Sequence, residues 1–166
     1  MDSIANIKNY IVTKHTFLLE SKQHGKKLHT IIHDQRGTFE VAMSPLRVIK
    51  NSCKAYGSNY RFSQENSKEL LTRLQKHKLP IVVGSDFGKP LILFPIFSPS
   101  AKHNMWIVYN NVISMSTHSV NVAVILKNSE EYDLPINKNT LVQQIASSGI
   151  LHNLVQKQWQ DNLRLF

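Results

Sequence analysis

Apolar and polar positions alternate in short stretches through the first quarter of the chain, and polar turns separate these stretches. Short alternating runs bounded by turn-forming residues are typical of β-strands. The pattern predicts strand-like pieces at 10–12, 16–19, 28–33 and 38–43. The polar stretch 20–27, which contains Gly25, is predicted to be a connection. The simplest interpretation is a β-meander that leads into a helix.

Clear start and stop signals bracket a helix over 45–56. Ser44 can accept a hydrogen bond from a free N–H of the first turn. Pro45 suits the first helical position, and Gly57 can adopt the left-handed conformation that closes a helix. One side of this helix is predicted to be buried, because its apolar residues recur at three- and four-residue spacing: Leu46, Ile49, Cys53 and Tyr56.

The neighbouring arc of the same helix carries cations and an amide: Arg47, Lys50, Asn51 and Lys54. A local arc of this kind can bind a negatively charged partner. Taken alone, the pattern is more typical of an ordinary amphipathic helix, because a run of charges usually only solvates a surface. Both interpretations stay open at the level of the helix alone.

A second helix is predicted over 67–78, with Ser67 as its N-cap. Its leucines form the buried side, and Arg73 and Lys76 are among the cations around the rest. Residues 58–66 are predicted to be a loop, so about nine or ten residues separate the two helices. A helix-turn-helix motif needs a turn of about three or four residues. The predicted spacing therefore argues against that motif.

The second half of the chain is predicted to contain further strands and a helical end. Apolar runs bounded by turn signals predict strands at 80–84, 91–97, 105–115 and 120–127, followed by a hairpin-like segment. Pro95 predicts a bulge or a sheet edge within its strand. From 137 onward apolar residues recur at helical spacing, and 147–149 is predicted to divide them into two helical pieces that cover a sheet or form a subunit contact.

The predicted fold class is therefore α+β, in a single domain spanning 1–166. It consists mostly of antiparallel strands that form a sheet or partial barrel. Two helices lie in the middle of the chain and a helical region lies at its C-terminal end.

Composition and cysteine content favour one globular domain in a reducing compartment. The 166 residues, 42% of them apolar, are enough for a sizeable core. No apolar run approaches the ~18–20 residues that a membrane span needs, and the N-terminus lacks a secretory pattern. One cysteine cannot form an internal disulfide. We expect a cytoplasmic protein with no membrane partner.

The net charge of +9 is concentrated in one part of the chain. Residues 43–78 hold eight Lys/Arg and two Asp/Glu, which is +6 of the total. Such a local excess beside a polar, partly aromatic segment favours a polyanionic partner, and nucleic acid is the usual one in a cytosol. A membrane surface is a less favoured partner, because no exposed aromatic or leucine face adjoins the cationic side of the 45–56 helix.

The segment 58–62 (S-N-Y-R-F) is a second candidate contact region. Asn59 and Arg61 can donate hydrogen bonds to acceptors in a narrow groove, and the rings of Tyr60 and Phe62 can stack or act as wedges. The alternative is that both rings anchor the segment to the core. The sequence favours neither interpretation over the other.

Enzymatic and metal-dependent functions find little support in the sequence. Cys53 lies on the apolar stripe, where a buried cysteine behaves as a small hydrophobic residue rather than a nucleophile. His24, His29 and His33 have no cysteine or carboxylate partners at zinc-motif spacing. No phosphate-binding or dinucleotide-binding glycine motif is present. We expect no catalytic residues, no metal and no cofactor.

Three blocks of sequence together resemble the bacterial competence transcription factor family, ComK, from about residue 9 to about residue 159. They are S-P-L-x-V-I-x-x-S-C-x-x-Y-G-S-x-Y from Ser44, P-I-V-V from Pro80, and I-L-F-P-I-F-S-P-S followed by W-I. The resemblance implies a homo-oligomeric activator of competence genes that binds paired A/T-rich boxes in double-stranded DNA, largely through the minor groove. RNA polymerase and adaptor–protease machinery are further partners that it implies.

Applied to this chain, the resemblance gives a set of expected DNA contacts: Arg47, Lys50, Asn51, Lys54, Asn59, Arg61, Arg73 and Lys76. The chain differs from the family's sequence pattern in three places. Asn104 stands where relatives usually have a second cysteine, and Tyr60-Arg61-Phe62 replaces a Tyr-x-Gly-Arg sequence. The usual tail beyond the last helix is missing, so we expect tail-borne functions to be weak or absent. The alternative function is therefore a non-activating protein of the same fold that binds or titrates a full-length relative.

Overall fold

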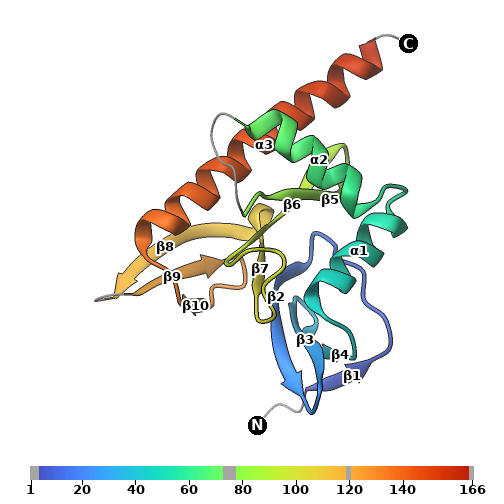
Figure 1. The fold of residues 1–166 in the computed structure, drawn as a ribbon. Coiled ribbons are helices and arrows are strands. Elements are labelled where there is room, and N and C mark those ends of the chain that lie inside the picture. Colours follow the sequence, from blue (N-terminus) through green and yellow to red (C-terminus); the bar gives the residue numbers. More distant parts are fainter. Residues whose placement is uncertain (1–3, 73–77, 119–120, 165–166) are drawn as a thin grey trace.

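The computed structural model describes residues 4–72, 78–118 and 121–164, and it shows the expected α+β architecture (Figure 1). The helices are α1 (Pro45–Ala55), α2 (Tyr60–Leu71), the short 3-10 helix η1 (Tyr109–Asn111) and α3 (Lys138–Arg164). The strands are β1 (Ala5–Ile7), β2 (Thr16–His24), β3 (Lys27–Asp34), β4 (Gly37–Val41), β5 (Ile81–Asp86), β6 (Lys89–Pro95), β7 (Met105–Val108), β8 (Val112–His118), β9 (Asn121–Leu126) and β10 (Glu131–Leu134). None of the helices in these ranges is long and apolar enough to cross a membrane.

Two open sheets organise the molecule. The larger has seven strands in the order β1-β4-β3-β2-β7-β6-β5, and the smaller has the order β10-β9-β8. All neighbouring strands are antiparallel except β1 and β4. The large sheet keeps β1 and β5 as edges, so the described strands form an open sheet and not a closed barrel. Mostly antiparallel pairing is confirmed.

Two segments near the N-terminus differ from the predicted structure. Residues 20–27 are not a connection, because the pairing of β2 with β3 continues to His24 and Lys27, and Gly25 makes the turn at a φ of +62°. Residues 10–12 are not a strand. The Val12 N–H donates to Ser52 Oγ, and its carbonyl accepts from the Tyr56 hydroxyl. Side chains of α1 and its cap therefore take the backbone groups that a strand would pair.

The predicted strand at 105–115 is two strands in different sheets. η1 separates β7 in the large sheet from β8 in the small sheet. The Asn111 amide donates to the carbonyls of Lys14 and Thr16, which holds the chain in the turn. Alternation alone misses this break, because the residues on both sides of it are strand-like.

Both later helices also differ from prediction. α2 begins at Tyr60 instead of 67, because Asn59 accepts a hydrogen bond from the Phe62 N–H at 2.8 Å and acts as the N-cap. α3 is one helix and not two pieces. Ser148 donates to the carbonyl of Gln144 inside the helix. A Cβ on Gly149 would lie 3.0 Å from the Tyr109 hydroxyl, so this glycine permits close packing instead of a break.

Strand β6 lies at the centre of the core. Leu91 and Leu93 join the cluster beneath α1, Phe94 joins the cluster between the two sheets, and Ile92 joins the cluster shared by α2 and α3. Pro95 is the last residue of this internal strand, paired with Trp106, so the predicted edge is wrong. The irregular pairing lies instead between Val82 and Gly84 in β5.

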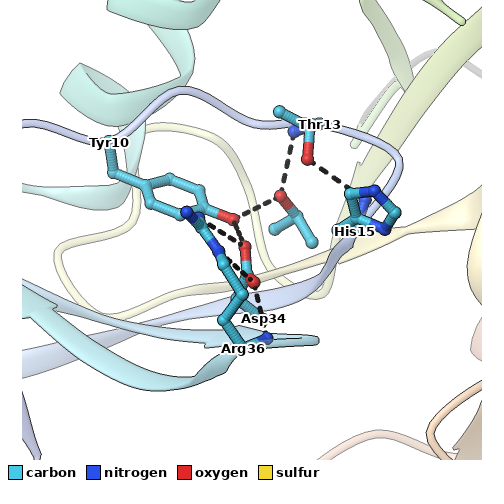
Figure 2. Close-up of polar contacts among 6 residues, drawn as sticks. Tyr10, Thr13, His15, Asp34 and Arg36 are labelled. Atoms are coloured by element: carbon cyan, nitrogen blue, oxygen red, sulfur yellow. Dashed lines mark hydrogen bonds and ion pairs between the residues drawn. The ribbon is translucent and has the colours of Figure 1, made fainter.

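A polar network fixes the segment between β1 and β2 (Figure 2). Asp34 accepts hydrogen bonds from the Tyr10 hydroxyl and from the guanidinium and backbone N–H of Arg36. Burial alone would raise the pKa of Asp34, but the hydrogen bonds from Arg36 outweigh it and lower that pKa. Burial and the neighbouring Asp34 raise the pKa of Tyr10. These opposite shifts favour an ionised Asp34 carboxylate that accepts a hydrogen bond from a protonated Tyr10 phenol, so the pair has a structural role.

Candidate nucleic-acid interface

The start, end and caps of helix α1 are as the sequence predicts, but its buried side differs in part, because Tyr56 is 36% exposed and Leu46 is only partly buried. Ser44 Oγ accepts from the Arg47 N–H at 3.3 Å, Pro45 occupies the start, and Gly57 follows the end of the helix with a φ of +82°. The buried side consists of Pro45, Val48, Ile49, Ser52 and Cys53. This side packs against the large sheet, so the opposite side must face outward.

The outward side of α1 carries the predicted cations. Arg47, Lys50 and Lys54 are all exposed, and α1 contains no Asp or Glu. Within the part of the chain that the structure describes, none of these three cations has a carboxylate within salt-bridge distance. We call Arg47, Lys50 and Lys54 the basic arc. Its charges are not neutralised internally, which leaves them available to an external anion.

Asn51 differs from its three neighbours on the predicted arc. Its side chain is only partly exposed, and its amide nitrogen donates to the Met43 sulfur, a weak acceptor, at 3.6 Å. It therefore helps to hold the chain that enters α1. Of the predicted α1 contacts, it is the one least available to a partner.

The segment predicted as a contact loop is the first turn of α2. Asn59 uses its side-chain oxygen as a helix cap. Tyr60 packs against the core beneath α1, and the Lys50 Nζ lies 5.7 Å from the centre of its ring. Phe62, by contrast, is 61% exposed. The two rings therefore have different roles: Tyr60 packs against the core and anchors the helix, whereas Phe62 faces solvent.

Arg61 points into solvent beside a shallow groove. Its Nε lies 3.2 Å from Glu65 Oε1 one turn further along α2, and the side chain is 87% exposed. An exposed pair of this kind contributes about 0.5 kcal/mol or less, so Arg61 can exchange it for another anion. The groove, of about 400 Å³, is lined by Arg61, Glu65, Lys68, Lys78 and Leu79, among others. Arg73 and Lys76, the last two predicted contacts, lie outside the described residues.

The connection between α1 and α2 is much shorter than predicted. It comprises residues 56–59, because α2 begins at Tyr60. Four residues fall within the length of a helix-turn-helix turn. The spacing argument against that motif was therefore wrong, because it rested on Ser67 being the cap. Ser67 is instead a buried residue in the interior of α2.

The β5–β6 turn is a surface feature that the sequence analysis did not single out. Phe87 and Gly88 occupy its two central positions, with φ of +47° and +79°. Positive φ at both positions is typical of a type I′ turn, which favours Asn, Asp or Gly. A bulky aromatic residue there is strained, and Phe87 is 91% exposed, so no packing compensates for it. A residue that is unfavourable at its backbone conformation, and whose side chain adds no packing, is often found at a functional site.

One cation lies over this exposed ring, and a second follows it in the turn. The Lys14 Nζ lies 4.9 Å from the centre of the Phe87 ring and 3.9 Å from Asp86 Oδ1, and Lys89 follows in the turn. Tyr56, at the end of α1, packs against Gly84 of the same hairpin. The sequence signal that could have found the feature is the Asp-Phe-Gly-Lys turn itself, where Asn is the expected residue at the Phe position.

Cys53 and Asn104 have structural surroundings. Cys53 is fully buried, and burial raises the pKa of its thiol to about 11, with Ser63 a smaller opposing influence. A neutral buried thiol is a poor nucleophile. Asn104 is also buried, and its amide bonds to backbone groups of Phe97 and Ser98. It braces the loop before β7 with hydrogen bonds that a cysteine could not supply.

Replacing Cys53 with alanine will lower the free energy of unfolding by about 1–2 kcal/mol, as a small core truncation does. DNA affinity will not change, because the thiol does not reach the surface. Urea denaturation and binding isotherms measure the two quantities. A Cys53→Ala variant with the parent's circular dichroism spectrum and no DNA binding would contradict the structural role.

Comparison of the sequence with known proteins identifies its family. The family model described as ComK protein matches residues 7–160. The chain is 27% identical over 153 residues to a competence transcription factor of Bacillus subtilis (strain 168), covering 92% of this chain and 78% of the relative. No solved structure matches. Because the family model matches residues 7–160 of a chain of 166, the chain belongs to the ComK family.

Proposed function

We propose that this protein regulates competence transcription by binding A/T-rich double-stranded DNA, largely in the minor groove, through the face formed by α1 and α2. The observation that carries the proposal is the basic arc: three exposed cations on one side of a helix that contains no acidic residue. The relative named a competence transcription factor supports the regulatory role. A regulator of this kind needs a binding surface and no catalytic centre.

The electrostatics favour a polyanion over a small acidic ligand. Arg47, Lys50 and Lys54 lie at three- and four-residue spacing, so they follow the helix axis as a row. A row of fixed cations matches regularly spaced phosphates and gains free energy by releasing their counterions. Arg61, at the start of α2, extends the charge beyond α1. An inserted arginine is attracted by the enhanced negative potential of a narrow A/T-rich minor groove.

Phe87 gives the proposed interface an apolar element. Minor-groove proteins often insert an apolar side chain between base pairs and kink the duplex. Phe87 has the required exposure and lies at the tip of a tight hairpin. Lys14 and Lys89 can bind the phosphates on either side of such an insertion. We propose that this turn is a second contact of the same duplex.

Binding to paired boxes requires more than one copy of the chain, so the proposal includes a homo-oligomer on DNA. The apolar residues of α3 favour a role within the chain for much of that helix. Leu141 packs between the sheets, Leu151 and Val155 are buried with α2, and Trp159 packs against them. RNA polymerase and an adaptor–protease system are the further proposed partners, and the described residues assign no surface to them.

The proposal is tested by titrating labelled duplexes with tandem A/T-rich boxes and matched G/C-rich duplexes. Tighter binding to the A/T boxes, and competition by a minor-groove ligand such as netropsin, will support it. Competition by the major-groove ligand methyl green alone would favour a helix-turn-helix mode, for which the four-residue connection leaves room. A protein that binds neither duplex but co-sediments with the Bacillus subtilis relative would favour the alternative function, a titrating partner.

Replacing Phe87 with asparagine will reduce DNA bending and weaken binding to A/T boxes by about tenfold, within the range of a lost stacking or wedge contact. The free energy of unfolding will stay the same or rise, because asparagine tolerates positive φ better than phenylalanine. Fluorescence energy transfer across the duplex and urea denaturation measure the two effects.

The matched control is Ile113→Asn, because Ile113 is 58% exposed but belongs to β8 in the other sheet. It should leave bending unchanged. A Phe87→Asn variant that bends DNA as the parent does would remove the turn from the interface without affecting the case for the basic arc.

A further inference from the structure

The face of the large sheet turned away from α1 gathers three metal-ligating side chains from three strands. In β4, Phe39 and Val41 pack towards α1, so Glu40 points to the opposite face. In β3, Ile32 packs towards α1 and His29 lies on the opposite face. His24 ends β2, next to the β2–β3 turn. Strand register explains the meeting, because Lys22 pairs with His29 and Ile31 pairs with Glu40.

The geometry of this cluster is compact. His29 Nδ1 lies 2.9 Å from Glu40 Oε2, and His24 Nδ1 lies 3.8 Å from the same oxygen. The two imidazole rings are stacked, with centres 4.2 Å apart and planes 7° from parallel. One ligand atom from each of the three residues falls within 4.8 Å of the others. Two ring nitrogens and a carboxylate oxygen therefore lie close enough together to share one ion after a small side-chain adjustment.

We propose that His24, His29 and Glu40 bind a divalent transition-metal ion, with Zn²⁺ the best match. Two imidazoles and one carboxylate, with water in the fourth position, form a common zinc ligand set. Mixed nitrogen and oxygen ligands favour Zn²⁺ over the oxygen-preferring Mg²⁺ and Ca²⁺. Such an ion would tie the tip of the β2–β3 hairpin to β4. Nothing in the proposed DNA contact requires it.

Two of the proposed ligands, His29 and Glu40, are already held in place by contacts in the structure. The Lys22 ammonium donates a hydrogen bond to the Glu40 carboxylate at 2.8 Å, and His29 Nδ1 lies 2.9 Å from its other oxygen. The side chains of His29 and Glu40 are 12% and 9% exposed, so the surrounding strands already hold them in place.

His24 supplies the adjustable ligand. Ligand atoms around a tetrahedral zinc ion lie roughly 3.3 Å apart, given bond lengths of about 2.0–2.1 Å. The 3.8 Å between His24 Nδ1 and Glu40 therefore has to shorten slightly, and the stacked rings have to turn so that their lone pairs converge. His24 is 63% exposed, so it can rotate without disturbing the core.

The positive charge of Lys22 provides a specific test of the proposal. Its Nζ lies 2.8 Å from Glu40 Oε1, on the oxygen that faces away from the histidine contacts. This ammonium repels a divalent cation at the neighbouring oxygen. Removing the charge should therefore strengthen metal binding. A histidine pair that captures metal by chance, without Glu40, would gain much less.

The test uses the full, untagged chain after chelator treatment, with ZnCl₂ titrated in a calorimeter and CoCl₂ titrated in a visible spectrophotometer. We expect one equivalent of Zn²⁺ to bind, a higher melting temperature, and the visible absorption of four-coordinate Co²⁺. His24→Ala, His29→Ala and Glu40→Gln should each weaken Zn²⁺ binding about tenfold or more. Lys22→Met should tighten it by several-fold.

The matched control is His33→Ala, because His33 lies on the same face of β3 but contacts Glu20 instead, at 2.9 Å. It should bind Zn²⁺ as the parent does. The proposal is overturned if the parent shows no stoichiometric Zn²⁺ binding. It is also overturned if His24→Ala, an exposed change that cannot unfold the sheet, binds as tightly as the parent, or if Lys22→Met weakens binding.

Discussion

Replacing Arg47, Lys50 and Lys54 together with glutamine will weaken DNA binding by about 100-fold at 0.15 M salt and will flatten its salt dependence. Each phosphate contact releases counterions, so the slope of log affinity against log salt will fall in magnitude by about 3. The fold will not change, because all three side chains are exposed and none has an internal ion-pair partner among the described residues. Binding isotherms at several salt concentrations measure the slope.

The charge-matched control replaces three exposed lysines on other parts of the surface: Lys26, Lys102 and Lys157. It removes the same net charge, so a site-specific effect will leave its salt slope near that of the parent. The basic arc is only a solvated surface if both triple variants lose the same affinity.

Arg61 should behave differently from the basic arc. Phosphate contacts position a protein without reading sequence, so loss of the arc should weaken A/T-rich and G/C-rich duplexes nearly equally. An arginine that enters a narrow groove reads its width, so Arg61→Ala should lose more on A/T boxes. Equal losses on both duplexes would instead place Arg61 on the phosphates.

Replacing Gly84 with alanine will lower the free energy of unfolding by about 2–3 kcal/mol, the upper part of the range for an overpacked site. A Cβ at this position would lie 2.3 Å from Cγ of Tyr56, far inside van der Waals contact. The ring must move, and its hydroxyl then loses the 2.8 Å hydrogen bond to the Val12 carbonyl. Urea denaturation measures the loss.

The cause is isolated by adding Tyr56→Ala to Gly84→Ala. If the clash with the ring is responsible, the double variant will be less destabilised than the sum of the two single variants. Strictly additive losses would show that Gly84 matters for another reason, such as the irregular pairing of β5 beside it. Because Tyr56 caps α1, the same cycle tests how firmly the end of that helix is fixed to the β5–β6 hairpin.

The part of the proposed interface that lies on α1 could be predicted from the sequence, because capping residues and residue spacing within the helix define it. Ser44, Pro45 and Gly57 define α1 by backbone chemistry, and three- and four-residue spacing separates its buried side from Arg47 and Lys50. The start of α2 was not predicted, because two residues could cap it. Both Asn59 and Ser67 are good N-caps, and only the packing of Tyr60 and burial of Ser67 select the earlier one.

The sequence by itself determined the α+β class, the basic arc and the buried position of Cys53, because periodicity and capping depend on neighbours within a few residues. Tertiary structure alone decided which distant side chains meet. His29 and Glu40 are eleven residues apart, and the register of β3 with β4 brings them within 2.9 Å. Tyr56 and Gly84 meet because α1 packs on β5. Such contacts depend on register and packing, which no local pattern encodes, since a one-residue shift would send each side chain to the other face.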